Sequence, residues 1–131
     1  MLRYCFYIIL FFIYGCGFVV EKKIRGPYYF IAVDTKEDLS IDYRLKSGDY
    51  AGRIPSIVNA YYTNDTLIIA EVKKYYNDDK DFSYYFLKTN LDHELAHLEE
   101  GEILFGPLNR KKYDSTVRAW DLKVILKKIK F

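Results

Sequence analysis

Two histidines and a glutamate in the last third of the chain are the residues best suited to chemistry. His93, Glu94 and His97 form the pattern H-E-x-x-H, and they include both histidines of the protein. On a helix, residues four apart share a face, so the two imidazoles could bind one zinc ion. The glutamate between them would then act as general base on a zinc-bound water. This spacing is that of a zinc peptidase.

The residues around the motif argue against an enzyme. A catalytic zinc needs a third protein ligand, and the chain has no third histidine. Glu100 stands where the longer zinc-binding motif has a glycine, no glutamate follows Glu102, and Asp114 and Asp121 lack a supporting pattern. We therefore predict a surface helix with no catalytic residue, no metal site and no cofactor, and we keep a small zinc peptidase as an alternative.

Two short helices are predicted in the C-terminal third. The first would carry the motif and run from Leu91 to about Glu100, capped by Asn90 and ended by Gly101. Its apolar face would contain Leu91, Leu95 and Leu98. The second would be capped by Asn109, and its apolar face would include Tyr113, Val117 and Trp120. The tail 121–131 has helical spacing but is dense in Val, Ile and Leu, and we favour a closing strand.

The residues before Asn90 predict antiparallel strands. The clearest is 39–46, where apolar and polar residues alternate with a period of two. Short polar turns separate the segments, which favours hairpins between successive strands. Residues 47–52, with two glycines, are predicted to form a loop. The predicted strands are 28–34, 39–46, 54–63, 66–73 and 82–88, with a short extended piece at 103–105 that Gly106-Pro107 would stop. The fold class is α+β: an antiparallel meander of about five to seven strands with one or two short helices.

The first 16 residues resemble a bacterial lipoprotein signal. Arg3 supplies a positive charge, an uncharged run follows from Tyr4 to Tyr14, and Ile13-Tyr14-Gly15-Cys16 resembles a lipobox. The resemblance implies that Cys16 receives a lipid and becomes the new N-terminus. We expect a signal peptide at 1–15, a membrane-proximal linker at 16–25, part of which could pair as a first strand, and one β-rich domain at 26–131. An uncleaved anchor over Tyr4–Val20 is the alternative.

Charge and cysteine content are consistent with an exported, lipid-anchored protein. The whole chain has a net charge of +2, and Arg3 is the one charged residue of the predicted signal, so the mature chain is nearly neutral. A nucleic-acid binder would show a strong basic face, and we predict no such partner. Cys5 leaves with the signal, so Cys16 has no partner for an intrachain disulfide.

Aromatic content is high, at 18%, with 14 tyrosines. Tyrosine and phenylalanine favour the half-buried surface of a β-sheet, so a sheet core is the simpler explanation. An aromatic platform for carbohydrate or peptide is the second.

Three stretches together resemble a family of small bacterial lipoproteins built on one domain of unknown function. They are GPYYFIAVDTKEDLSIDY, SYYFLK and FGPLN, and the similarity spans about residues 26 to 118. The resemblance implies an exported, β-rich lipoprotein, and it implies no activity, cofactor or catalytic residue.

These patterns predict an envelope lipoprotein with a binding or structural role. A lipid on Cys16 would hold it to the non-cytoplasmic side of a bacterial membrane. Its second partner would be an envelope protein. A membrane-tethered zinc peptidase and an inhibitor or immunity-type protein are the alternatives.

Overall fold

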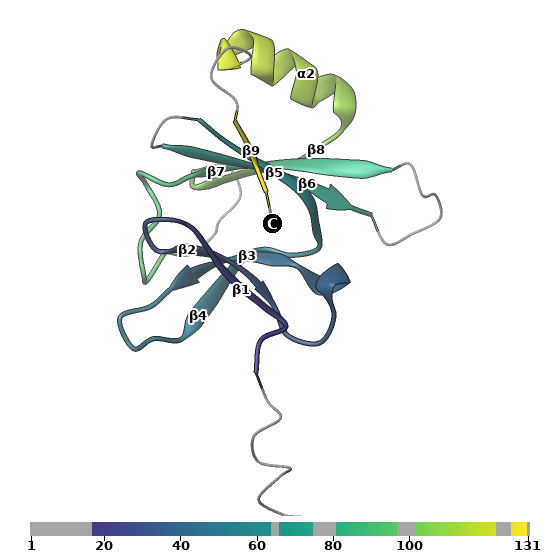
Figure 1. Ribbon diagram of the computed structural model, residues 1–131. Helices are drawn as coiled ribbons and strands as arrows, with labels where there is room; N and C mark the ends of the chain where they lie inside the picture. The colour runs from purple at the N-terminus through teal and green to yellow at the C-terminus, as the bar shows by residue number, and fades with distance from the viewer. Residues whose placement is uncertain (1–16, 64–65, 75–80, 97–101, 123–126, 131) are drawn as a thin grey trace, which may run out of the picture.

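The computed structural model describes residues 17–63, 66–74, 81–96, 102–122 and 127–130. Within them the chain forms two antiparallel sheets and one α-helix (Figure 1). Sheet A has the strand order β1 (Val20–Arg25), β2 (Tyr28–Ala32), β3 (Ser40–Arg44) and β4 (Tyr50–Ile54). Sheet B has the order β8 (Leu104–Leu108), β7 (Phe82–Lys88), β6 (Leu67–Lys73), β5 (Ile57–Thr63) and β9 (Lys127–Ile129). The short 3-10 helix η1 (Lys36–Asp38) joins β2 to β3, and the α-helix α2 spans Arg110–Ala119.

The elements stack in three layers (Figure 1). The inner faces of the two sheets pack on each other in a core that includes Phe30 and Ile41 from sheet A and Ile68 and Leu87 from sheet B. The opposite face of sheet B is covered by α2, whose Val117 packs in a second apolar cluster with residues of β6, β7 and β8. Sheet A therefore has one face in the core and one face turned away from the rest of the molecule.

The predicted fold class is confirmed: the chain is mostly β, antiparallel, with a helix in its C-terminal third. The hairpins β2–β3 and β5–β6 pair as expected, and β7 has the predicted bounds. Asn109 caps α2, because its side chain accepts a hydrogen bond from the Lys112 backbone N–H at 2.9 Å. The tail ends in a strand, β9, which pairs with β5.

The predicted strand 54–63 is wrong as one element. The chain breaks at Pro55-Ser56, where Ser56 has a φ of 55°, and crosses there from sheet A to sheet B. Proline has no N–H to offer a ladder, so a break at this point is expected on physical grounds. The expected loop 47–52 is shorter than predicted, because residues from Tyr50 onward pair with β3 as β4.

The predicted helix over 91–100 is wrong for the residues that the structure describes. Residues 91–96 form turns and irregular backbone, and 97–100 lie outside the described residues. The expected stop at Gly106-Pro107 is also wrong, because β8 continues through both residues to Leu108. Gly106 has a φ of 146°, a conformation open to glycine, and this lets the strand continue.

The start of the domain lies in the stretch predicted as linker. β1 occupies its second half, as the sequence allowed, and the Val19 N–H bonds to the Ala32 carbonyl at 2.8 Å. The chain enters this strand from the side of sheet A, opposite α2 (Figure 1). Among the described residues, no helix has the length and apolar character needed to cross a membrane.

Candidate functional site

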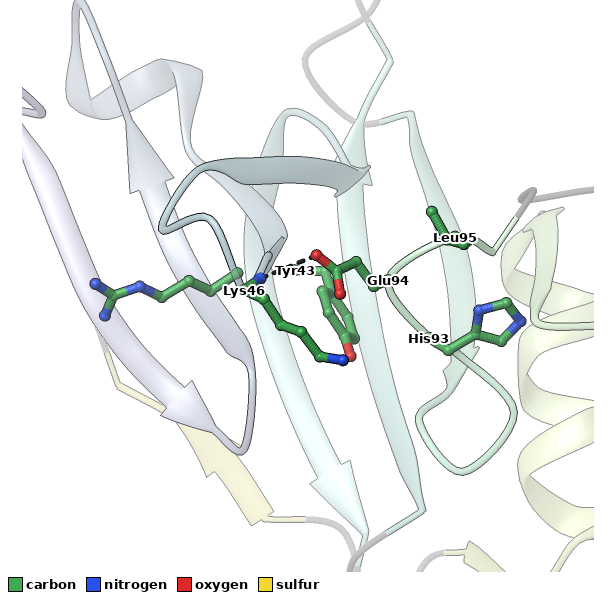
Figure 2. Close-up of a pocket in the computed structure, with 6 residues that line it drawn as sticks. Tyr43, Lys46, His93, Glu94 and Leu95 are labelled. Atoms are coloured by element: carbon green, nitrogen blue, oxygen red, sulfur yellow. Dashed lines mark hydrogen bonds between the residues drawn. The ribbon is translucent and has the colours of Figure 1, made fainter.

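The H-E-x-x-H motif begins in the turn that follows β7 and lies beside the end of β3. A pocket of about 330 Å³ opens there between the end of β3 and the turn that follows β7 (Figure 2). It is lined by Tyr43, Arg44, Lys46, His93, Glu94 and Leu95. This is the place where the predicted chemical residues meet the rest of the fold.

The motif residues of the pocket do not converge on one point. Figure 2 shows the Glu94 carboxylate directed toward Lys46 and the His93 ring directed away from it. The Glu94 carboxylate accepts a hydrogen bond from the Lys46 backbone N–H at 3.0 Å. His97 lies outside the described residues. Because a zinc peptidase needs its histidines and glutamate on one helix, this turn does not supply the geometry that the motif would require.

A buried ion pair anchors the turn under the pocket. Arg53 donates from Nε to Asp92 Oδ2 at 2.8 Å and from Nη2 to the His93 carbonyl at 3.1 Å. The side chains of Arg53 and Asp92 are 4% and 0% exposed. The Tyr28 hydroxyl also donates to Asp92 Oδ2, at 3.0 Å. Arg53 thus holds the backbone at His93, directly before Glu94, and this fixes the position of Glu94.

A β-bulge explains how a charged strand residue comes to point inward. Ile41 pairs with Ile54 and Asp42 with Gly52, so Arg53 is the extra residue on β4. A bulge re-aims the side chain that it carries. The guanidinium of Arg53 lies 5.0 Å from the centroid of the Tyr43 ring, a cation–π distance.

The Tyr28 hydroxyl keeps its proton at neutral pH. Burial, followed by the neighbouring Asp92 carboxylate, raises the pKa of Tyr28 far above its usual value. Tyr43, which lines the pocket, meets the Tyr28 ring edge-on at 5.5 Å. One oxygen of Asp92, Oδ1, is buried and accepts no hydrogen bond from the described residues. The network is therefore a structural support that is not fully satisfied.

The remaining residues singled out in the sequence are not assembled into a site. Asp114 lies on α2 and pairs with Arg110, and Asp121 follows that helix with a φ of 51°. Among the described residues, no three metal-ligand side chains gather in one place. Cys16 and Cys5 lie outside the described residues, and Gly17 is the first residue described.

A second cluster of interacting aromatic residues lies on the outer face of sheet A. The Tyr50 ring meets the Tyr29 ring at 5.5 Å and the Phe18 ring, edge-on, at 5.4 Å. Arg44 lies over the Tyr29 and Tyr50 rings at 5.5 and 6.0 Å and donates to the Tyr29 hydroxyl at 3.2 Å. The Tyr50 hydroxyl donates to Glu21. We call these five residues the outer cluster.

No protein-family model, no curated protein and no solved structure matches the chain.

Sequence reasoning missed both the Arg53–Asp92 pair and the outer cluster. The ion pair joins residues 39 positions apart, and nothing local in the sequence marks either of them. The outer cluster had one visible signal, the high tyrosine content, for which a sheet core was the favoured explanation and an aromatic platform only the second.

Proposed function

We propose that this protein is an exported lipoprotein, anchored in a bacterial membrane through a lipid on Cys16, with a binding or structural role in the envelope. The observation that carries the proposal is the lipobox-like sequence Ile13-Tyr14-Gly15-Cys16, which is followed almost at once by a β-rich domain. The aliphatic residue three positions before the cysteine and the small residue just before it fit the lipidation signal.

The start of β1 supports a lipid anchor over an uncleaved membrane anchor. The alternative span would need the uncharged run from Tyr4 to Val20. Val20, however, pairs with Ala32 in sheet A, and the Val19 N–H bonds to the same residue. The apolar run outside the sheet thus ends near Phe18, which leaves fewer than the about 20 residues that a spanning helix needs.

The pocket geometry favours a role in binding over one in catalysis. Glu94, the residue that a peptidase would use as base, is engaged by the Lys46 backbone. The same pocket presents an ammonium group, a tyrosine ring and an exposed Leu95, a mixture typical of a contact surface. Its partner would be another component of the envelope.

Replacement of the lipidated cysteine tests the proposal. We expect Cys16→Ser to abolish incorporation of labelled fatty acid and to leave the signal peptide uncleaved, because cleavage follows lipidation of the cysteine. The matched control is Cys5→Ser, which changes the other cysteine and should leave both readouts as in the native protein. Fatty-acid incorporation by Cys16→Ser equal to that of the native protein would contradict a lipid anchor at Cys16.

A further inference from the structure

The apolar residues at the entry point of the chain are exposed. Phe18, Val19 and Val33 have 45%, 48% and 52% of their surface accessible. Val19 and Val33 lie side by side, because Val20 pairs with Ala32 and the Val19 N–H bonds to the Ala32 carbonyl. With the rest of the outer cluster, which contributes two tyrosine rings and the charged side chains of Glu21 and Arg44, they form one mixed surface on the outer side of sheet A.

The chemistry of this surface matches a membrane interface. Tyr29 and Tyr50 present rings with polar hydroxyls, a combination enriched where a protein meets the headgroup layer of a bilayer. Lys23 lies opposite Tyr29 in the β1–β2 register and is exposed, and Arg44 is exposed beside the same ring. Both cations are available to lipid phosphates, while the apolar residues can reach the acyl boundary.

The covalent tether limits where this surface can go. Three peptide units separate Cys16 from Val19, which is already fixed on the sheet, so the two Cα atoms lie at most about 11 Å apart. The headgroup region on each side of a bilayer is about 5–8 Å thick. A lipid on Cys16 therefore holds the entry point of sheet A close to the membrane surface.

The direction of the chain decides which face meets the membrane. Phe18 lies against Tyr50, so the segment leaving Cys16 runs over the outer face of sheet A. The opposite side of the molecule is closed by sheet B and α2 (Figure 1).

We propose that the outer face of sheet A, formed by Phe18, Val19, Val33 and the outer cluster, rests on the headgroup layer of the membrane that holds Cys16. This inference depends on the lipid anchor proposed above. It gives the anchored domain a fixed orientation, with sheet A on the lipid and α2 pointing away from it.

Tryptophan fluorescence in lipid vesicles tests this orientation. The chain has one tryptophan, Trp120, which is 42% exposed next to α2. In a Trp120→Phe background, Tyr50→Trp and Tyr29→Trp each place a single probe on the proposed face. The mature lipidated chain would be reconstituted in dioleoyl phosphatidylcholine vesicles with or without brominated acyl chains. We expect bromine to quench both variants strongly and to leave the native protein, with Trp120 alone, almost unquenched.

A third variant separates the failure of this inference from the failure of the anchor. Phe18→Trp in the same background reports on closeness to the lipid whatever the tilt of the domain. Quenching of Phe18→Trp without quenching of Tyr50→Trp or Tyr29→Trp would overturn the orientation and leave the lipoprotein intact. Equal quenching of all probes, Trp120 included, would also overturn it. A chain that carries no lipid at Cys16 by mass spectrometry would overturn both proposals.

Discussion

At the scale of single residues, the Arg53–Asp92 pair is the contact whose loss should lower the free energy of unfolding most. Each partner is almost inaccessible to solvent, so removing one leaves an uncompensated charge in the interior. We expect Asp92→Ala to lower the free energy of unfolding by about 3–5 kcal/mol. The measurement is urea unfolding of the purified domain, residues 17–131, at neutral pH.

An exposed aspartate provides the matched control for Asp92. Asp114 pairs with Arg110 on the surface of α2, where the two side chains are 46% and 68% accessible. Asp114→Ala should change the free energy of unfolding by less than about 1 kcal/mol, because exposed ion pairs contribute little. Equal effects of the two substitutions would show that the buried pair does not stabilise the turn after β7.

The buried pair also shows where sequence reasoning ends at this scale. The H-E-x-x-H motif could be read from five consecutive residues, but its described part, 93–96, follows Asp92, whose carboxylate is bound by Arg53 from β4 of sheet A. Leucine spacing predicted a helix over 91–100 because periodicity considers only apolar residues. The ion pair between Asp92 and Arg53 outweighs the local preference for a helix in 91–96, and the Leu95 side chain is left 81% exposed.

At the scale of elements, the pairing of β7 with β8 depends on the absence of a side chain at Gly106. A Cβ at this position would lie 2.7 Å from the Tyr84 carbonyl oxygen and 2.8 Å from Tyr85 Cδ1, and its φ is 146°. We expect Gly106→Ala to lower the free energy of unfolding by about 1–3 kcal/mol, since both the backbone and the neighbouring strand resist it. Thermal unfolding of the purified domain would measure the loss.

Gly52 on β4 is the control for this element. A Cβ there would meet nothing within 4 Å. Gly52→Ala should therefore leave stability unchanged or raise it by no more than about 1 kcal/mol, because it restricts the unfolded chain. If Gly106→Ala were as stable as Gly52→Ala, the close approach of β8 to β7 would not be required.

Elements were predictable where their signal is local. The alternation over 39–46 and the polar turns at 35–38 and 64–65 identify β3 and the hairpins, because burial of one strand face leaves a period of two in the sequence. Pro55 was a visible warning that 54–63 is not one strand. The two glycines near β4 predicted a loop, and nothing nearby shows that Tyr50 and Arg53 are held in a sheet by β3.

At the scale of the whole molecule, the three layers bury some tyrosines between elements and leave Tyr50 partly exposed on the outer face of sheet A. Burial raises the pKa of Tyr28, Tyr84 and Tyr113, and partial burial with the hydrogen bond to Glu21 raises the pKa of Tyr50 to about 12. Two of these residues belong to sheet A, Tyr84 lies on sheet B and Tyr113 lies on α2. Their titration is thus a property of the assembled fold.

This pattern predicts that the protein loses stability in alkali. An unfolded tyrosine has a pKa of about 10, so above that pH the unfolded chain loses protons that the folded chain still holds. Because the folded state then binds more protons than the unfolded chain, the free energy of unfolding falls as pH rises.

The contribution of Tyr50 is complete below about pH 10 and is lost as the pH rises through the pKa of about 12 that Tyr50 has in the folded state. Urea unfolding midpoints should therefore be level around pH 8 to 9 and decline above about pH 10. Tyr50→Phe should make that decline shallower, whereas a midpoint that stayed level to pH 12 would show that folding does not protect these hydroxyls.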